Sequence, residues 1–437
     1  MLVRYKTTED GSAAKQAEIY VADEHKLSPS SVDPDALKII HRLRGAGHSA
    51  YVVGGAVRDL LLQKLPKDYD IVTDAAPARI RKLFRNSRVI GKRFRLVHIF
   101  FGEKIVEVST FRAEISEGFM NVYGEIEEDV KRRDFTVNSL YYNPEDNTVL
   151  DYTGGFRDVM AHKLRPVIAL EKIFAEDAVR MIRAVKYCAG AGLRMGFRLK
   201  RQLKRSVTGL ADCPASRMTE ELFKILGSSH AREIFAECER FGMLKFMLPE
   251  VDALMRSHKE FKPAFYRMME LLDSLVGEGE ARKQRFMAYL CAPYLYHVSE
   301  YAAAERIPFR EAFVELKTAI RPMVPANRDI EQALVHLIRR RKVYRKFATL
   351  ERPDGEDDDD DHVRPHKRKR PHASASPAAE TTAYQKPTPA SRGGEGVGAP
   401  HSAAQRSGKS RRRRRPRREG GADAPRENRP QERPPEI

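Results

Sequence analysis

The chain has 437 residues, enough for two or three domains with a sizeable buried core. It carries 79 Lys and Arg against 61 Asp and Glu, a formal net charge of +18 at pH 7. The first 350 residues hold 59 basic and 46 acidic side chains and the last 87 hold 20 and 15, so most of the excess precedes residue 351. A basic folded part favours a polyanionic partner over a role in solubility alone.

Neither a membrane protein nor a disulfide scaffold is indicated. No stretch approaches the roughly 18 consecutive apolar residues of a membrane span. The N-terminal sequence MLVRYKTTEDGSAAK lacks the apolar segment of a signal peptide. The four cysteines form no CxxC pair, so no zinc knuckle or disulfide framework is expected. These features predict a cytoplasmic protein without a membrane span.

The first predicted elements, in chain order, form a mixed α/β region over 33–165. Residues 1–32 are polar and mixed and are expected to form a loose N-terminal extension. A helix should begin after Asp33, which can cap its N-terminus, because Pro34 suits the first helical position. A strand, a glycine turn and a short helix follow. Further strands are predicted near Val89 and at 69–72, 96–101 and 105–111.

An all-helical part is predicted next, divided into 166–230 and 231–350. Segments such as AVRMIRAVKYCA and HAREIFAECERFGMLKFM repeat apolar residues at helical spacing. Residues 351–437 contain no Leu, Phe or Met, so they cannot bury enough apolar surface to fold and are predicted to be disordered. This tail opens with the acidic run GEDDDDD and becomes basic at RPHKRKRP and KSRRRRRPRRE.

Asp68 and Asp70 lie one residue apart in the segment KDYDIVT. On a strand, residues i and i+2 point to the same face, about 6.5–7 Å apart, and two carboxylates there repel unless a cation neutralises them. Hard cations prefer oxygen ligands, so two Mg²⁺ ions would suit the pair, with Mn²⁺ as a substitute. Glu107, in the strand KIVEVSTF, is a candidate third carboxylate, although a solvent-facing residue would look the same. A DxD motif alone also occurs in exposed loops and calcium sites.

Gly54 and Gly55 separate an apolar strand from the helix VRDLLLQ. A glycine turn lets backbone N–H groups approach phosphate oxygens, and a helix N-terminus adds partial positive charge. Two glycines before a helix are a weak signal alone. GGxVRD followed nine residues later by DxD is much stronger, and it predicts that this end of the sheet holds a nucleoside triphosphate.

The segment KRRDFTVNSL carries a polar pair at helical spacing. Asp134 and Asn138 are i and i+4, so they should share a helix face, where both can hydrogen-bond sugar hydroxyls. Arg132 and Arg133, which come directly before, could reach phosphates.

The segment EDAVRMIR places Asp177 and Arg180 at i and i+3 on one predicted helix face. The alternative for this pair is a surface ion pair worth less than about 1 kcal/mol. The earlier segment DYTGG, with Asp151, Gly154 and Gly155, indicates a turn that loop chemistry alone can explain.

The order GGAVRD, DYD, RRDFTVN, DYTGG and EDAVR resembles the family of tRNA nucleotidyltransferases and bacterial poly(A) polymerases, class II of the nucleotidyltransferase superfamily. The resemblance covers about residues 35–250, and five motifs in register are highly specific. It implies an α+β fold: a catalytic head with a five-stranded mixed sheet and flanking helices over 33–165, a base-binding neck over 166–230 and an RNA-binding body over 231–350. It also implies transfer of a nucleoside monophosphate from a triphosphate to an RNA 3′ hydroxyl.

The resemblance implies a role for each motif. Asp68 and Asp70 would bind the metal ions. The incoming nucleotide would be held by Gly54, Gly55, Arg58, Arg133, Asp134 and Asn138, and its base would be read by Asp177 and Arg180. A carboxylate beside a guanidinium matches the amine and ring nitrogen of adenine or cytosine and mismatches uracil and guanine. The base-reading pair therefore cannot separate a poly(A) polymerase from a CCA-adding enzyme.

Other segments favour the poly(A) polymerase branch. VIGKRFRLVHIFFGEKIVEVSTFR and VYGEIEEDVKRRDFTVNSLYY resemble that branch, whereas CCA-adding enzymes usually carry a Gly-Thr-rich segment at the first of these positions. The basic tail is similar too, but the connection from Phe111 to Gly124 looks shorter than in many members. The expected function is template-independent addition of AMP from ATP to RNA 3′ ends, in RNA 3′-end processing and decay.

Two alternatives stay open at this point: a CCA-adding enzyme, and a non-catalytic RNA-binding protein with the same fold. Intact acidic residues in all five motifs argue against the second. The expected partners are ATP, the 3′ ends of mRNA and small RNAs, and RNA-decay proteins.

Overall fold

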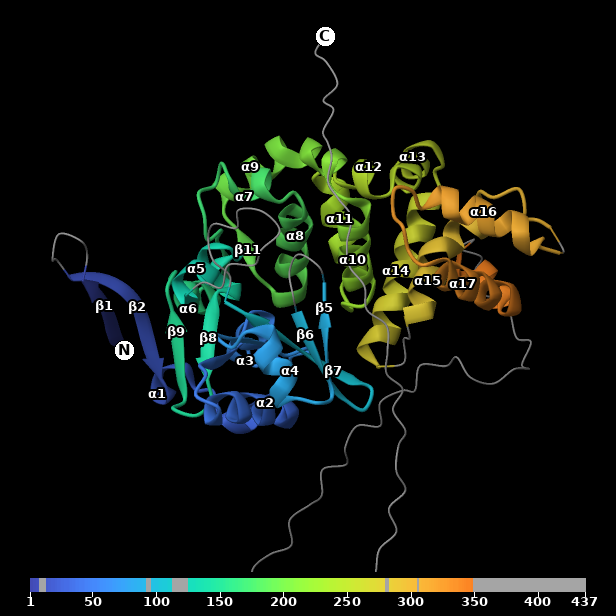
Figure 1. Ribbon diagram of the computed structural model, residues 1–437. Coiled ribbons are helices and arrows are strands. Elements are labelled where there is room, and N and C mark those ends of the chain that lie inside the picture. Colours follow the sequence, from blue (N-terminus) through green and yellow to red (C-terminus); the bar gives the residue numbers. More distant parts are fainter. Residues whose placement is uncertain (8–12, 92–95, 112–124, 280–282, 305, 349–437) are drawn as a thin grey trace, which may run out of the picture. The chain divides into compact units, whose positions relative to one another are not determined.

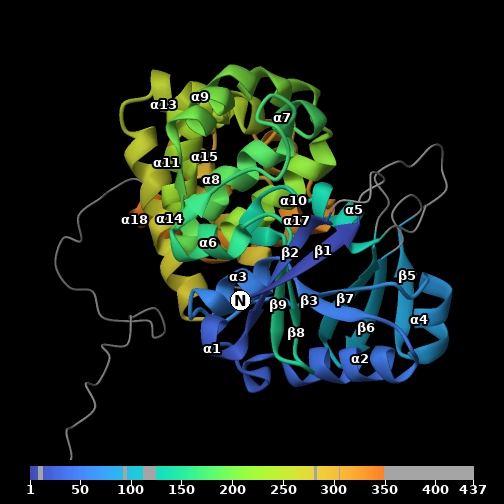
Figure 2. The same cartoon turned by 90° about the vertical axis from the view of Figure 1, so that its left-hand side faces the viewer.

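The front of the chain forms a nine-stranded mixed sheet in the computed structural model shown in Figures 1 and 2. The structure describes residues 1–7, 13–91, 96–111, 125–279, 283–304 and 306–348. In spatial order the strands are β1 (Leu2–Thr7), β2 (Ala13–Val21), β9 (Thr148–Asp151), β8 (Leu140–Asn143), β3 (Ala50–Val53), β4 (Asp70–Thr73), β7 (Lys104–Thr110), β6 (Leu96–Phe101) and β5 (Ser87–Ile90). Neighbours are antiparallel except β4 and β7, which run parallel.

Two expectations about this sheet are wrong. The sheet is wider than the five strands expected, and residues 1–32 are not a loose extension, because β1 and β2 lengthen the sheet beside β9. Glu18 of β2 pairs with Asp151 of β9, although the two residues are far apart in the sequence. Among the described side chains of β2, only Ala17, Glu18 and Tyr20 are buried. The sequence therefore has no clear alternation of apolar residues from which this strand could be predicted.

Helices cover the sheet on the face that carries the main core. The predicted first helix is confirmed as α2 (Pro34–Gly45), and the Asp33 carboxylate caps it by accepting from the Asp35 N–H at 2.9 Å. Its buried residues Ile39, Ile40 and Leu43 belong to the main hydrophobic cluster. The other head helices are α1 (Ala22–His25), α3 (Gly55–Leu61), α4 (Pro77–Leu83), α5 (Ile126–Lys131) and α6 (Gly155–Met160), with the 3-10 turns η1 (Pro29–Ser31) and η2 (Thr136–Asn138).

The opposite face of the sheet carries a smaller apolar cluster. Val53, Val72 and Tyr141 belong to it, and their strand neighbours Val52, Ile71 and Tyr142 belong to the main cluster. Side chains alternate along a strand, and Asp70 is two residues before Val72 and paired with Val53. Asp70 therefore projects from the face with the smaller cluster, away from α2.

The remainder of the described chain is helical apart from one short strand pair. The predicted change of texture is confirmed, since β10 (Lys163–Leu164) pairs in parallel with β11 (Arg194–Met195) but all other elements are helices. The neck contains α7 (Ile173–Glu176), α8 (Val179–Ala191), α9 (Phe197–Ser206), η3 (Val207–Asp212) and α10 (Ala215–Leu226). The body contains α11 (Ala231–Arg240), α12 (Leu244–Met247), α13 (Pro249–Ser257), α14 (Phe261–Gly277), α15 (Lys283–His297), α16 (Phe309–Ala319), α17 (Asn327–Arg339) and α18 (Arg341–Ala348).

The DYTGG turn has a structural role. The Asp151 carboxylate accepts hydrogen bonds from the N–H groups of Gly154 (2.8 Å), Gly155 (3.0 Å) and Phe156 (2.9 Å), and so it satisfies the free donors at the start of α6. A Cβ on Gly155 would lie 2.1 Å from the Thr136 carbonyl oxygen. Glycine at this position lets α6 pack directly against η2, the turn that carries Asn138.

Three expectations fall outside the described residues: the disorder of 351–437, the length of the 112–124 connection and the RFRL segment at 93–96, of which only Leu96 is described. No helix in the described ranges is long and apolar enough to cross a membrane.

Candidate nucleotidyl-transfer site

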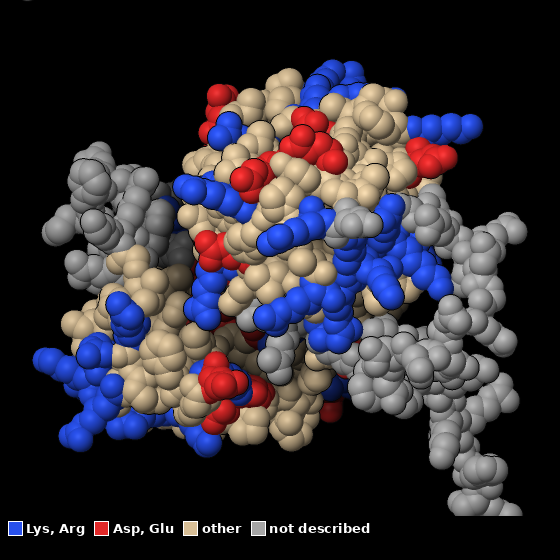
Figure 3. Space-filling view, turned by 90° about the vertical axis from the view of Figure 1, so that its right-hand side faces the viewer, with Lys and Arg blue, Asp and Glu red and all other residues tan. Residues whose placement is uncertain are grey.

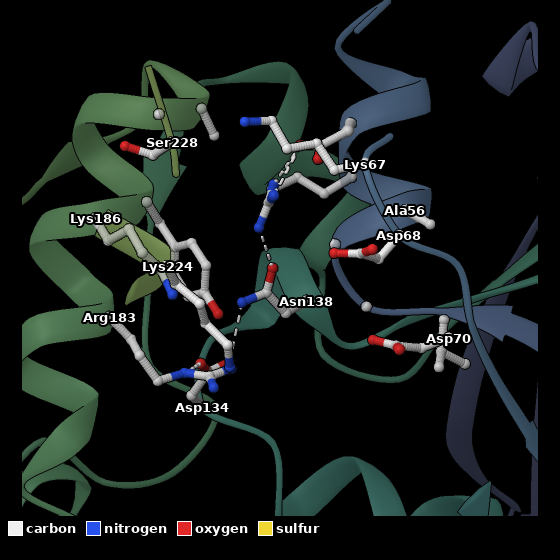
Figure 4. Close-up of a pocket in the computed structure, with 18 of the residues that line it drawn as sticks. Ala56, Lys67, Asp68, Asp70, Asp134, Asn138, Arg183, Lys186, Lys224 and Ser228 are labelled. Carbon is white, nitrogen blue, oxygen red and sulfur yellow. Dashed lines mark hydrogen bonds and ion pairs between the residues drawn. The ribbon is translucent and has the colours of Figure 1, made fainter. Parts of the chain in front are cut away.

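A pocket of about 1010 Å³ lies between the head and the neck, and Figure 4 shows its interior. Head residues on its wall include Gly54, Asp68 and Asp70, and neck residues include Asp177 and Arg180. All eleven residues that the sequence assigns to metal, nucleotide or base binding line this one pocket, whereas Asp151, Gly154 and Gly155 do not. Its volume is at the upper end of the range for small-molecule sites, roughly 300–1,000 Å³, and therefore suits a nucleotide together with part of a second substrate.

The acidic residues are presented by two adjacent parallel strands. Asp70 is the first residue of β4 and is paired in register with Glu107 of β7, so their side chains share one face. Asp68 lies before β4 begins, and the expectation that both aspartates sit on one strand is wrong. Both carboxylates nevertheless point into the pocket (Figure 4). Glu107 also has His98 Nε2 at 3.3 Å from Oε1.

The environment of Asp70 disfavours its charged form. The position of Asp70 inside the cleft partly desolvates its carboxylate and, with the nearby Glu107 carboxylate, raises the pKa of Asp70 to about 6. The side chain is nevertheless accessible from the pocket, so a bound cation could reach it directly. Arg133 and Lys224 oppose the shift through their positive charge.

The residues around Asp70 fit a divalent cation. Three carboxylates, from Asp68, Asp70 and Glu107, line one wall, and carboxylate oxygens are the ligands that Mg²⁺ prefers. Within the described ranges, no three acidic, histidine or cysteine side chains are already close enough to form a complete metal site. Burial is the main cause of the raised pKa of Asp70, and the repulsion from Glu107 that adds to it is one that a cation would relieve.

Glycine is required at the turn between β3 and α3. Gly54 has φ +73° and ψ −134°, a conformation that side chains with a Cβ rarely adopt. A Cβ there would lie 3.7 Å from Arg133 Nη1 and 3.9 Å from Asp70 Oδ2. The bare backbone therefore leaves space beside the acidic residues at the N-terminus of α3, as predicted for a phosphate-binding turn.

A chain of hydrogen bonds crosses the pocket from head to neck. Arg58 Nη1 donates to Asn138 Oδ1 at 2.7 Å, and Asn138 Nδ2 donates to Asp134 Oδ1 at 3.0 Å. Arg183 of α8 then donates from Nε to Asp134 Oδ2 at 2.7 Å. Figure 4 labels three of its members, Asn138, Asp134 and Arg183. Burial alone would raise the pKa of Asp134, but Arg183 and hydrogen bonds from Asn138 and Phe135 outweigh it and lower that pKa.

The expected helix for Asp134 and Asn138 is wrong. Asp134 precedes η2, a single 3-10 turn that ends at Asn138. The two residues still meet, through the hydrogen bond between their side chains. Arg133 is held by Asp129, whose Oδ2 accepts from Nη2 at 2.8 Å, and by the Asn138 carbonyl at 3.1 Å. Its guanidinium braces the turn beside the pocket.

Asp177 and Arg180 do not pair with each other, and they do not share one helix. Asp177 ends α7, whereas Arg180 lies in the first turn of α8. Arg217 of α10 holds both Asp177 oxygens, at 2.9 and 2.7 Å. Arg180 donates from Nη1 to Glu176 at 3.1 Å and to the Ile173 carbonyl at 3.2 Å. The surface ion pair considered for the two residues is therefore absent, and both face the pocket.

The sequence reading missed three cations on the neck wall: Arg183, Lys186 and Lys224. Arg183 and Lys186 follow Arg180 at steps of three in RMIRAVK, a spacing that places all three on one side of α8. This spacing could therefore have identified Arg183 and Lys186 as pocket residues. Lys224, in EELFKIL of α10, had none, because only the packing of α10 against α8 brings it to the pocket.

Comparisons with known proteins agree with this architecture. A family profile described as "Poly A polymerase head domain" matches residues 50–165, and one described as "Probable RNA and SrmB- binding site of polymerase A" matches residues 192–255. Poly(A) polymerase I of Salmonella typhi is 40% identical over 259 residues, covering 56% of each chain. The CCA-adding enzyme of Bacillus velezensis is 34% identical over 220 residues, covering 48% of this chain and 54% of that enzyme.

A solved structure of a CCA-adding enzyme in an apo form has the same fold, with a TM-score of 0.50 and 22% identity over 77% of this chain and 89% of that one. The match to the curated relatives is less extensive, because the chain spans little more than half of their length. Within that span, the motif order, both profiles and the fold agree. Residues 50–165 and 192–255 thus match the head domain and the RNA-binding segment of poly(A) polymerases, and the same part of the chain is similar to CCA-adding enzymes.

Proposed function

We propose that the protein is a poly(A) polymerase, which adds AMP from ATP to RNA 3′ ends without a template. One observation carries the proposal: a single pocket brings the carboxylates of Asp68, Asp70 and Glu107 together with Asp177 and Arg180, which suit an adenine edge. Higher identity to poly(A) polymerase I than to a CCA-adding enzyme supports ATP as the nucleotide. RNA 3′-end processing and decay would be the process served, and RNA-decay proteins stay an expected partner.

The chain's own residues would position the reactants. The Gly54 turn leaves room for phosphates beside the acidic residues, and the chain of Arg58, Asn138 and Asp134 presents polar groups to the ribose. The RNA 3′ oxygen would attack the α-phosphorus in line as pyrophosphate leaves, a reaction that depends mainly on positioning and charge neutralisation.

Asp68 and Asp70, with Glu107 as third carboxylate, would hold two Mg²⁺ ions, for which Mn²⁺ could substitute. Bound there, the ions would lower the pKa of the attacking hydroxyl and neutralise phosphate charge. The raised pKa of Asp70 supports this assignment, because the site gains most from a cation where carboxylates already repel.

The base would be read by Arg180 and Asp177. The guanidinium of Arg180 would donate to adenine N1, and an Asp177 oxygen would accept from the N6 amine. Arg217 holds the Asp177 carboxylate in place through two hydrogen bonds, and the Val179 N–H donates to Oδ1 at 3.2 Å, so Oδ2 is the oxygen that keeps a lone pair for the base. Uracil and guanine would present mismatched groups at both contacts.

One experiment tests this function and its alternatives. The protein is incubated with Mg²⁺, each of the four NTPs in turn, and either a generic RNA or a tRNA lacking its CCA end. Long extension with ATP on generic RNA is expected. A CCA-adding enzyme would instead add two cytidines to the tRNA when given CTP and then stop, and a non-catalytic RNA-binding protein would release no pyrophosphate. Either of these results would overturn the proposal.

A further inference from the structure

The neck wall of the pocket gathers three cations around one buried carboxylate. Glu221 of α10 is only 3% exposed, and it forms ion pairs with Lys186 of α8, with Lys224 at 3.4 Å and with Arg183 at 3.5 Å. Asp134 is the other carboxylate in reach, and it is bound to Arg183 Nε at 2.7 Å. Three cations therefore share two carboxylates, and the group retains positive charge.

This positive charge is unusually confined. The side chains of Lys186 and Arg183 are 13% and 32% exposed, so water can solvate them only in part. Burial, together with the like charge of Arg183, lowers the pKa of Lys186 to about 8 despite its pairing with Glu221. Lys224 is the most accessible of the three, at 56% exposed, and its contact with Glu221 is longer than a normal ion pair of this type. A bound anion would offset the excess positive charge of this group.

The three cations face the acidic residues across the pocket. In Figure 4, Arg183, Lys186 and Lys224 project from one side, and Asp68 and Asp70 project from the other. The charge of Lys224 is close enough to Asp70 to oppose the rise in its pKa. Among the head cations that line the pocket, Arg133 is held by Asp129 and Arg58 by Asp59 and Asn138. Lys64 and Lys67 donate to the Gly190 and Gly227 carbonyls, at 2.9 and 2.7 Å. The best-placed cations for a phosphate chain are thus on the neck.

We propose that Lys224, supported by Lys186 and Arg183, forms a polyphosphate subsite that holds the β- and γ-phosphates of the incoming nucleotide and then the pyrophosphate. The inference rests on the proposed function for its ligand. In the transfer step the RNA 3′ oxygen bonds to the α-phosphorus, and the bond from that phosphorus to the β-bridging oxygen breaks. Pyrophosphate leaves with the electron pair, and the hydroxyl proton passes to solvent. The subsite would neutralise the charge on the leaving group.

The test separates polyphosphate binding from turnover. Binding of inorganic tripolyphosphate and of AMP is measured by calorimetry, without RNA or metal, for the wild type, Lys224→Met, Lys224→Arg and Lys204→Met. Lys204 is an exposed α9 lysine outside the pocket, so its variant controls for the loss of one charge. Removing one charge-assisted phosphate contact should weaken tripolyphosphate binding by about tenfold or more. AMP binding should be unchanged, Lys224→Arg should restore tripolyphosphate binding, and Lys204→Met should match the wild type.

If Lys224 only balances the charge of Glu221, Lys224→Met will lower the unfolding temperature and leave tripolyphosphate affinity unchanged, and that result would overturn the inference. The wild type supplies a second measurement that needs no variant. Tripolyphosphate should compete with ATP for the wild-type protein but bind together with adenosine, and simultaneous binding with ATP would also overturn the inference. Neither measurement requires RNA extension, so a failure of the polymerase proposal would be visible separately.

Discussion

Asp70 illustrates how a single residue can serve the reaction at the expense of the fold. Its carboxylate is withdrawn from bulk water and placed in register with Glu107, and both effects raise its pKa to about 6. A side chain whose charged form is disfavoured in the folded state reduces stability whenever it is ionised. A cation between the carboxylates would remove this penalty, which explains why such a pair is tolerated.

The first prediction concerns Asp70→Asn. Chain extension should be lost, because a candidate metal ligand loses its charge. Without metal at pH 8, the unfolding temperature should rise, because the folded pKa of about 6 exceeds the ordinary Asp value of roughly 3.9 and the ionised form is removed. Below the ordinary Asp pKa the gain should vanish, since both states are then protonated. Thermal unfolding, with the exposed Asp74→Asn as control, measures the change in stability. An assay of RNA extension tests the metal assignment, and extension at a near wild-type rate would contradict it.

The second prediction concerns pH. Metal binding requires ionised Asp70, so the affinity for Mn²⁺ should fall as pH decreases through about 6. Below that value the decrease should approach about tenfold per pH unit. Direct titration with Mn²⁺, followed by electron paramagnetic resonance, measures it without turnover. Glu107→Gln should move the transition to lower pH, because the neighbouring carboxylate is the second cause of the shift. Constant affinity between pH 7 and 5 would contradict the assignment.

The third prediction concerns base selection. Arg180→Ala should reduce ATP use, because adenine N1 loses its donor. Asp177→Ala should also reduce it, and discrimination against UTP and GTP should shrink by about ten- to a hundredfold, because the acceptor that selects an amine is gone. Incorporation of all four NTPs by each variant measures this. Unaltered ATP-over-UTP selectivity in both variants would mean that the base is read elsewhere.

Most site residues were predictable from sequence, but their local geometry was not. Motif spacing identified Asp68, Asp70 and the neck pair, and the structure places them in one pocket. Spacing alone wrongly placed Asp134 and Asn138 on a helix, because a 3-10 turn also brings residues four apart into contact. The sequence alone could not identify Lys224 as a pocket residue, because its position depends on the packing of α10 against α8.

At the scale of elements, close contact between α6 and η2 fixes the turn that carries Asn138. This contact depends on Gly155, where a Cβ would lie 2.1 Å from a backbone oxygen that cannot rotate away. Asp151 secures the same junction by capping α6. The DYTGG motif thus supports the pocket without lining it.

The fourth prediction is that Gly155→Ala destabilises the protein by more than about 3 kcal/mol, above the usual cost of overpacking, because backbone must move. Gly209→Ala is the matched control, since a Cβ there meets nothing within 4 Å. Denaturant unfolding of both variants measures the difference. Equal stability of the two would show that η2 can shift, and the proposed rigidity of the Asn138 turn would be wrong.

Elements were predicted best where the local pattern was strong. The capped α2 helix, β6 and the change to an all-helical texture all followed from periodicity and capping signals. The strands β1 and β2 were missed because this margin of the sheet buries few apolar residues, and because β9, the partner of β2, is far away in sequence. Local pattern carries no information about such pairing.

At the scale of the whole molecule, positive charge is spread well beyond the pocket. Figure 3 shows groups of Lys and Arg side chains on one face. Elsewhere in the described chain, the short helix α18 carries Arg341, Lys342, Arg345 and Lys346. The sequence adds a further excess after residue 350, concentrated in KSRRRRRPRRE. Such charges bind polyanions by releasing condensed counterions.

The fifth prediction is that removal of residues 351–437 leaves nucleotide incorporation on saturating short RNA intact but weakens binding to long RNA. The slope of log K against log salt concentration should become shallower, because fewer phosphates are neutralised. Filter binding across a salt series measures the slope for both chains. An identical slope would show that this segment makes no contribution to RNA binding.

The pairing of β2 with β9 also bears on the order in which the chain is assembled. Ile19 meets Leu150, so the first hairpin has no sheet to join until more than a hundred further residues have been made. Contacts between such distant segments form slowly, and an unpaired strand edge is prone to intermolecular association in the meantime. During synthesis, β1 and β2 would therefore lack their partner strand until β9 has been made. Recombinant yield should therefore respond to translation speed and temperature through this hairpin, although none of its described residues lines the pocket.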